Sequence, residues 1–112
     1  MKLEVRGQNI EVSDALRDHL ARRLHYALGR FEGRVTGATA RLADLNGPRG
    51  GVDKRCRIIV AMRAQEPILV EDTDSDVYAA VDRATERAGR AVWRQLERRR
   101  DMDVRQDTSK SA

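Results

Sequence analysis

Five arginines recur at three- or four-residue steps late in the chain, and guanidinium groups at this spacing could bind phosphate. On a helix, at about 100° per residue, they would lie within an arc of roughly 80°. The planar guanidinium grips phosphate with paired hydrogen bonds and stacks on bases. Guanidinium groups held this close also repel one another, and an anionic partner would relieve that repulsion. The stripe consists of Arg83, Arg87, Arg90, Arg94 and Arg98.

A solvated helix face is the alternative explanation of this stripe. Arg90 could pair with Glu86, and Arg94 could pair with Glu97, along the same helix. However, Asp82, Glu86 and Glu97 fall to one side of the stripe and do not interleave with it. This segregation of charge favours a phosphate-binding surface.

A second basic line runs along the segment 13–31. It contains His19, Arg23, Tyr26 and Arg30, with Arg22 beside it. Tyr26 could instead cover the edge of the core, and His19 could be an ordinary surface residue. If both helices lie side by side on one face of a sheet, their outward stripes would join into a basic surface suited to a folded RNA backbone.

Aromatic residues make up only 4% of the chain, which argues against an RNA reader that stacks bases on its sheet. Trp93 could cover the core edge, stack on a base or contact a partner. The strand positions expected to be exposed are basic instead, so recognition should be mostly of backbone and shape. These positions are Lys2, Arg6, Arg41, Arg55 and Arg57.

No catalytic or metal site can be assembled from the remaining residues. Asp72, Asp74 and Asp76 imitate the start of a calcium loop, but Val77 and Arg83 occupy the places of its glycine and its bidentate glutamate. With two histidines and one cysteine, a closed zinc site would need several carboxylates. We therefore expect no enzyme activity, no metal, no cofactor and no small-molecule substrate.

The composition limits the class of protein. A chain of 112 residues with 40% hydrophobic residues can build one modest core, and a charged share of 36% argues against a membrane-embedded protein. The net charge is only +4, yet just three of the 22 basic residues are lysines. A genome-wide bias toward arginine codons is the alternative explanation of that preference. The position of the arginines must decide between a phosphate-binding role and codon bias.

The only cysteine, Cys56, cannot form an internal disulfide, and no apolar leader follows Met1. We therefore expect a cytoplasmic protein. Cys56 itself fits a buried small apolar residue better than a nucleophile, because it falls on the inward side of an expected strand.

The hydrophobic periods predict six elements in the order β-α-β-β-β-α. Alternation predicts strands at 2–6, 34–42, 55–63 and about 68–71, and the 3.6-residue period predicts helices at 13–31 and about 75–100. Ser13 or Asp14 could cap the first helix, and 43–53 reads as a mobile loop. We predict a two-layer α+β fold with two helices on one face of a four-stranded, largely antiparallel sheet. The domain would span 1–100, with a disordered tail at 101–112.

Three strings of residues resemble one known family. They are D-V-Y-A-A-V-D at 76–82, S-D-A-L-R-D-H-L-A-R-R-L at 13–24 and K-L-E-V-R-G-Q-N-I-E-V-S at 2–13. Together they resemble the ribosome hibernation-promoting factors, also called ribosome-associated inhibitor A or sigma-54 modulation proteins. The similarity extends over about residues 1–95.

This resemblance implies a domain that binds the small ribosomal subunit in the channel between head and body, overlapping the paths of messenger and transfer RNA. Arg22 and Arg23 match paired basic residues in the family's first helix, and Arg87, Arg90 and Arg94 match basic residues in its second. The helical-wheel argument adds Arg30 and Arg83. These seven arginines form our predicted site for ribosomal RNA.

The leading hypothesis is thus a non-enzymatic hibernation factor that inhibits translation under stress. The alternative is a protein-interaction or transcription-modulating module that forms a homodimer or meets an acidic partner. The chain ends before a second domain of the kind that joins two ribosomes in long family members. We therefore do not expect it to pair ribosomes alone, and its self-association stays open.

Overall fold

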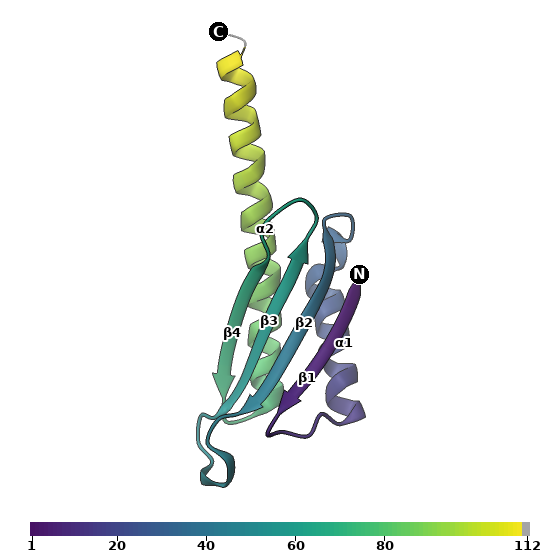
Figure 1. Cartoon of the computed structure of the whole chain (residues 1–112), viewed down its shortest axis with the longest axis vertical. Coiled ribbons are helices and arrows are strands. Elements are labelled where there is room, and N and C mark those ends of the chain that lie inside the picture. Colours follow the sequence, from purple (N-terminus) through teal and green to yellow (C-terminus); the bar gives the residue numbers. More distant parts are fainter. Residues whose placement is uncertain (111–112) are drawn as a thin grey trace.

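The computed structural model describes residues 1–110, and side chains as far as Met102. Four strands form one layer and two helices form the other, which confirms the two-layer α+β prediction (Figure 1). The strands are β1 (Lys2–Gln8), β2 (Val35–Asp44), β3 (Lys54–Met62) and β4 (Ile68–Asp74), and the helices are α1 (Asp14–Leu28) and α2 (Val77–Lys110).

The sheet runs in the order β1-β2-β3-β4, with β1 at one edge and β4 at the other. The pairings β2–β3 and β3–β4 are antiparallel, so the sheet is largely antiparallel as expected. The pairing β1–β2 is parallel. Two parallel neighbours need a crossover, and α1 provides it by carrying the chain back along the sheet.

Both helices cover the same face of the sheet, and the other face is left open (Figure 1). Alternation sends every second side chain of each strand toward the helices, where Leu42, Ile58 and Val60 are buried. The helix α1 contributes one stripe of leucines, whereas α2 contributes mostly small residues that let it lie close to the strands. These buried residues are Leu16, Leu20, Leu24, Leu28, Ala80, Val81, Ala84, Ala88 and Val92.

Local residues fix where the two helices begin. Ser13 is the N-cap of α1, because its Oγ accepts a hydrogen bond of 3.1 Å from the Leu16 N–H. At the start of α2, the Asp76 carboxylate accepts one of 2.9 Å from the Tyr78 N–H. Asp74, two residues earlier, still belongs to β4, so the helix begins only after Asp76.

The loop expected at 43–53 is tied down at both ends. The Lys54 ammonium lies 2.8 Å from Asp53 and 3.5 Å from Asp44, and the Asp53 side chain is fully buried. The Leu45 N–H also donates to the Asp53 carbonyl at 2.8 Å. Strand pairing thus continues to Asp44 on β2 and Lys54 on β3, and only the segment between them turns away from the sheet.

Residues 101–110, which the sequence places in a disordered tail, continue α2, and 111–112 of that tail lie outside the described residues. The apolar period ends near Leu96, so the hydrophobic pattern alone gave no reason to extend the helix. Its backbone hydrogen bonds need no apolar face, and no glycine or proline follows Gly89 to interrupt them. Among the described residues, neither this helix nor α1 has the apolar length required to cross a membrane.

The thiol of Cys56 lies fully buried between β3 and the helices. Burial, with the charge of Asp72 as a smaller cause, raises its pKa to about 12. We expect the native protein to resist an aromatic disulfide reagent at pH 8, and unfolding in guanidinium to release one reactive thiol per chain. Because the chain has one cysteine, the change in the absorbance of the reagent reports the reaction of Cys56 alone. Rapid labelling of the native protein would contradict the burial.

Candidate nucleic-acid interface

The two helices lie against each other at Ala27 and Gly89. A Cβ atom added to Gly89 would stand 3.1 Å from the carbonyl oxygen of Ala27, which is a tight contact, so glycine leaves room for the helices to lie this close. The close approach brings the outward sides of α1 and α2 into one surface, as the sequence argument requires.

An open groove of about 440 Å³ runs over this contact. Arg30, just beyond α1, and Arg90, on α2, both line it, and Glu86 contributes its one carboxylate. The Arg30 guanidinium lies 4.7 Å from the centre of the Phe31 ring, which holds its stem in place. Tyr26 also lines the groove and is 87% exposed, so it does not cover the core edge.

Arg23 has carboxylate partners on the other helix. Its Nε lies 3.3 Å from Asp82, and its Nη2 lies 3.9 Å from Glu86. His19 reaches the same Asp82 oxygen at 2.7 Å. Two of the three acids expected on one side of the stripe, Asp82 and Glu86, therefore face α1 and join the two helices.

Arg83 and Arg87 point toward β4 and join α2 to that strand. The Arg83 guanidinium lies 2.6 Å from Asp74 and 3.2 Å from Asp72, and it also donates to the Thr73 carbonyl at 2.8 Å. Arg87 lies 3.1 Å from the second oxygen of Asp72. Two of the seven predicted arginines are thus engaged in holding the fold together.

Four of the predicted arginines make no ion pair with any residue whose side chain is described, namely Arg22, Arg30, Arg90 and Arg94. Arg22 is exposed on α1. Arg94 lies with Arg98 in a shallow hollow beside Pro67 and Ile68, on the β4 side of α2. The two basic lines therefore meet only where Arg30 and Arg90 share the groove, because the α2 stripe is turned toward β4 rather than centred on the outward face.

The ion pairs of β4 should make the protein sensitive to acid. The backbone N–H of Asp76 and the guanidinium of Arg83 hold the pKa of Asp74 below its ordinary value of 3.8, and the Gly47 N–H does the same for Asp44. A carboxylate with a depressed pKa adds stability that is present above the ordinary pKa and is lost as pH falls through the folded pKa. We expect the urea midpoint to fall progressively below about pH 4.

The matched variant for this measurement is Asp74→Asn. It keeps an oxygen that can accept the Asp76 N–H but removes the titrating charge. Its urea midpoint should therefore change less between pH 5 and pH 3 than that of the wild type. An identical acid response in both proteins would show that Asp74 is not a source of the sensitivity.

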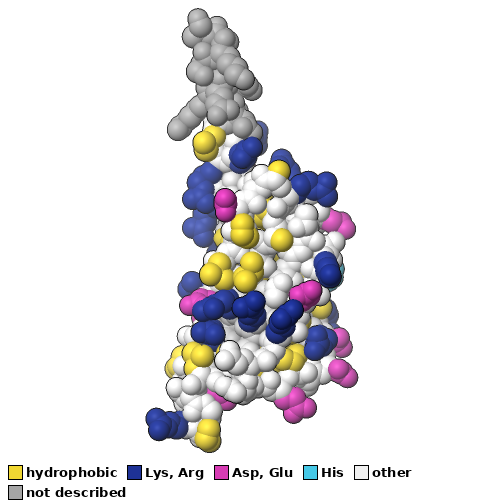
Figure 2. Space-filling model, in the orientation of Figure 1, with side chains coloured by type: hydrophobic (Ala, Val, Ile, Leu, Met, Phe, Trp, Pro, Cys, Tyr) yellow, Lys and Arg dark blue, Asp and Glu magenta, His cyan; other side chains and the backbone are white. Residues whose placement is uncertain are grey.

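The open face of the sheet carries a second group of arginines, which the predicted site did not include. They are Arg6, Arg41, Arg55 and Arg57. The space-filling view shows dark-blue side chains in a row across the strands (Figure 2). Alternation along the sequence indicated that these side chains are exposed. Only the register of the strands shows that they lie next to one another.

The acids that imitated a calcium loop do not form one. Asp72 and Asp74 lie in β4 and bind Arg83 and Arg87, while Asp76 caps α2. Within the described part of the chain, no three His, Cys, Asp or Glu side chains gather as metal ligands would.

Comparison with known proteins identifies the family. The model of the sigma 54 modulation protein / S30EA ribosomal protein family matches residues 3–100. The chain belongs to this family. The sigma 54 modulation / S30EA proteins are ribosome-associated hibernation and interface factors without enzymatic activity. The match confirms the family resemblance of the three strings of residues.

Two solved structures share the fold. The N-terminal domain of Protein Y from Thermus thermophilus is 29% identical, with a TM-score of 0.71, and the match covers 84% of this chain and 98% of that domain. A ribosomal subunit interface protein from Coxiella burnetii is 17% identical, with a TM-score of 0.73, and the match covers 87% of this chain and 99% of that one. No curated protein matches the sequence significantly.

Proposed function

We propose that the protein binds ribosomal RNA of the small subunit through the outward surface of α1 and α2, in the decoding channel. The observation that carries this proposal is the pair Arg30 and Arg90. They come from different helices, flank one groove and have no carboxylate partner among the described side chains. A guanidinium without an internal partner can bind phosphate without first breaking an ion pair. Occupying the channel would block messenger and transfer RNA and keep idle ribosomes inactive.

The seven predicted arginines divide into two roles. Arg22, Arg30, Arg90 and Arg94 have no ion-pair partner among the described side chains, so they can meet phosphates directly. Arg23, Arg83 and Arg87 already hold carboxylates, so they contribute only through the guanidinium edges that those partners leave open. Their main effect is to fix the helices that present the other four.

Tyr26 gives the groove a feature that the basic residues lack. Its ring is almost fully exposed beside Arg30 and Arg90, and an exposed aromatic ring can stack on an unpaired base. We therefore assign phosphate contacts to the arginines and one stacking contact to Tyr26.

Sedimentation with purified small subunits tests the proposal. We expect the protein to pellet with them at low salt and to be released as salt rises. The logarithm of affinity should fall by about 0.7 to 0.9 per log unit of salt concentration for each phosphate contacted. Transfer RNA added in excess should displace it. A protein that binds small ribosomal subunits in this way works in the cytoplasm.

A pull-down before and after nuclease treatment separates this proposal from a protein-interaction module. Loss of all ribosomal material after nuclease treatment supports RNA binding. Capture of a protein partner that survives nuclease treatment, with no ribosomal RNA in the untreated sample, would overturn it.

A further inference from the structure

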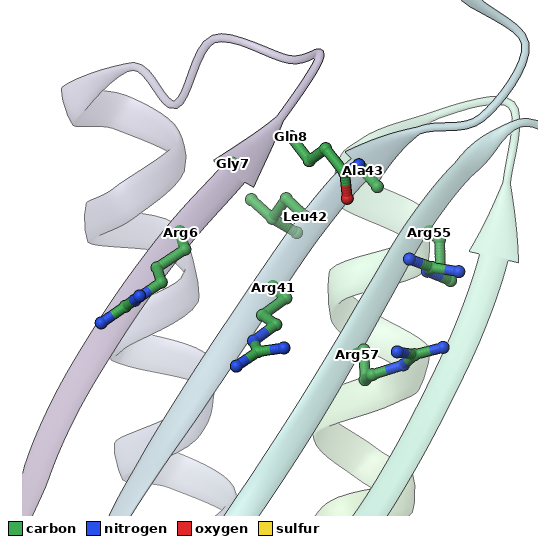
Figure 3. Close-up of a pocket in the computed structure, with 8 residues that line it drawn as sticks. All are labelled: Arg6, Gly7, Gln8, Arg41, Leu42, Ala43, Arg55 and Arg57. Atoms are coloured by element: carbon green, nitrogen blue, oxygen red, sulfur yellow. The ribbon is translucent and has the colours of Figure 1, made fainter.

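The open face of the sheet carries one row of charge across all four strands. In the register, Arg6 lies opposite Arg41, Arg41 opposite Arg57, and Arg57 opposite Glu71. Opposite residues on paired strands point to the same side, and neighbouring strands lie about 4.8 Å apart. These three arginines therefore occupy neighbouring positions on the open face, where Figure 2 shows a row of dark-blue side chains across the sheet. In the close-up, the Arg6 guanidinium turns away from Arg41 and the Arg57 guanidinium turns toward β4 (Figure 3).

A shallow hollow lies beside this row. Arg55 precedes Arg57 by two residues, so both side chains point to the open face, and its neighbour across the strands is the small residue Ala43. Because Ala43 fills little space, a hollow of about 230 Å³ remains, with Gln8 beyond it on β1. The close-up shows the side chains of Arg6, Arg41, Arg55 and Arg57 around this part of the sheet (Figure 3).

Few carboxylates neutralise these arginines. Arg57 Nε lies 3.0 Å from Glu71, and Arg6 lies 3.8 Å from Glu4. Arg41 and Arg55 have no carboxylate partner among the side chains described. Moreover, Arg55 Nε is shielded from solvent and has no hydrogen-bond acceptor there. A shielded donor without an acceptor is unfavourable, and an anion in the hollow would supply one.

The chemistry of this face fits phosphate oxygens rather than bases. Paired donors on guanidinium groups match phosphate geometry. Base stacking requires an exposed ring, but every aromatic residue of the chain lies outside the strands. These residues are Tyr26, Phe31, Tyr78 and Trp93.

We propose that the open sheet face binds the phosphate backbone of a second RNA segment, on the side of the domain opposite to the helices. The proposal rests on the proposed function, because it takes RNA of the same subunit as the partner. Arg41 and Arg55 are the principal ligands, and Arg6 and Arg57 stand beside them. The domain is then held between two RNA segments, and both faces contribute to its affinity.

The double variant Arg41→Gln with Arg55→Gln tests this surface. Its matched control is Arg17→Gln with Arg49→Gln, which removes the same charge from two exposed arginines that line neither the groove between the helices nor the hollow on the sheet. In sedimentation with small subunits, we expect the sheet variant to lose affinity on the order of tenfold for each arginine removed. The slope of log affinity against log salt should fall by about one for each. The control should differ little from the wild type.

Thermal unfolding followed by circular dichroism establishes that both variants are folded. Wild-type affinity and salt slope in a folded sheet variant would overturn the sheet-face proposal alone, because the helices would still bind. Absence of binding by the wild type would overturn the proposed function as well. A sheet variant that binds subunits normally but loses affinity for polyglutamate would replace RNA with an acidic protein as the partner of this face.

Discussion

Glutamate in place of Arg30, Arg90 and Arg94 together is expected to abolish binding to small ribosomal subunits. None of the three has a carboxylate partner among the described side chains, and Arg30 and Arg90 line the groove between the helices. A hydrogen bond from a charged donor contributes about 1.5 to 3 kcal/mol, so losing three weakens binding roughly a thousandfold or more. Repulsion between glutamate and phosphate adds to that loss. Sedimentation at low salt measures it.

The matched control is Arg83→Gln with Arg87→Gln. These two side chains hold Asp72, and Arg83 also holds Asp74, so their loss loosens α2 from β4. We expect this variant to unfold at lower urea but to retain most of its affinity for subunits. If it loses binding as completely as the triple variant while still folded, the division of the arginines into two roles is wrong.

Valine in place of Gly89 is expected to give the second largest effect, on both stability and binding. Its Cβ would lie 3.1 Å from the Ala27 carbonyl, and its methyl groups would extend further into α1. Overpacking of this kind costs about 1 to 3 kcal/mol of unfolding free energy. The helices must also move apart, which separates Arg30 from Arg90 across the groove. Urea unfolding and sedimentation measure the two effects.

Alanine at the same position serves as the control. In a helix, alanine is more favourable than glycine by about 1 kcal/mol, which offsets the tight contact of its single methyl group. Its stability and affinity should therefore stay close to those of the wild type. Equal losses for alanine and valine would mean that the Cβ atom common to both residues, and not the larger side chain of valine, disturbs the contact between the helices.

The sequence by itself determined the elements and their layers. The leucines of α1 recur at helical spacing and the strands alternate, because each element has one face that must leave water. The sequence also predicted the capping residue Ser13 and the family motifs, since both depend on residues that are neighbours along the chain. The sequence did not predict the end of α2, because the apolar pattern stops before the helix does.

Only the tertiary structure decided which arginines lack a carboxylate partner among the described side chains. A helical wheel gives Arg83, Arg87 and Arg90 the same exposure, but the partners of Arg83 and Arg87 come from β4. Likewise, Arg23 meets Asp82, which lies far along the chain.

The register of the strands decided the sheet face in the same way. Alternation exposes Arg41 and Arg57, but only strand pairing places them side by side. Charge interactions depend on distances in space between residues that are remote in sequence. A local pattern can therefore predict that an arginine is exposed, while the packing of the helices and strands determines whether it is already neutralised.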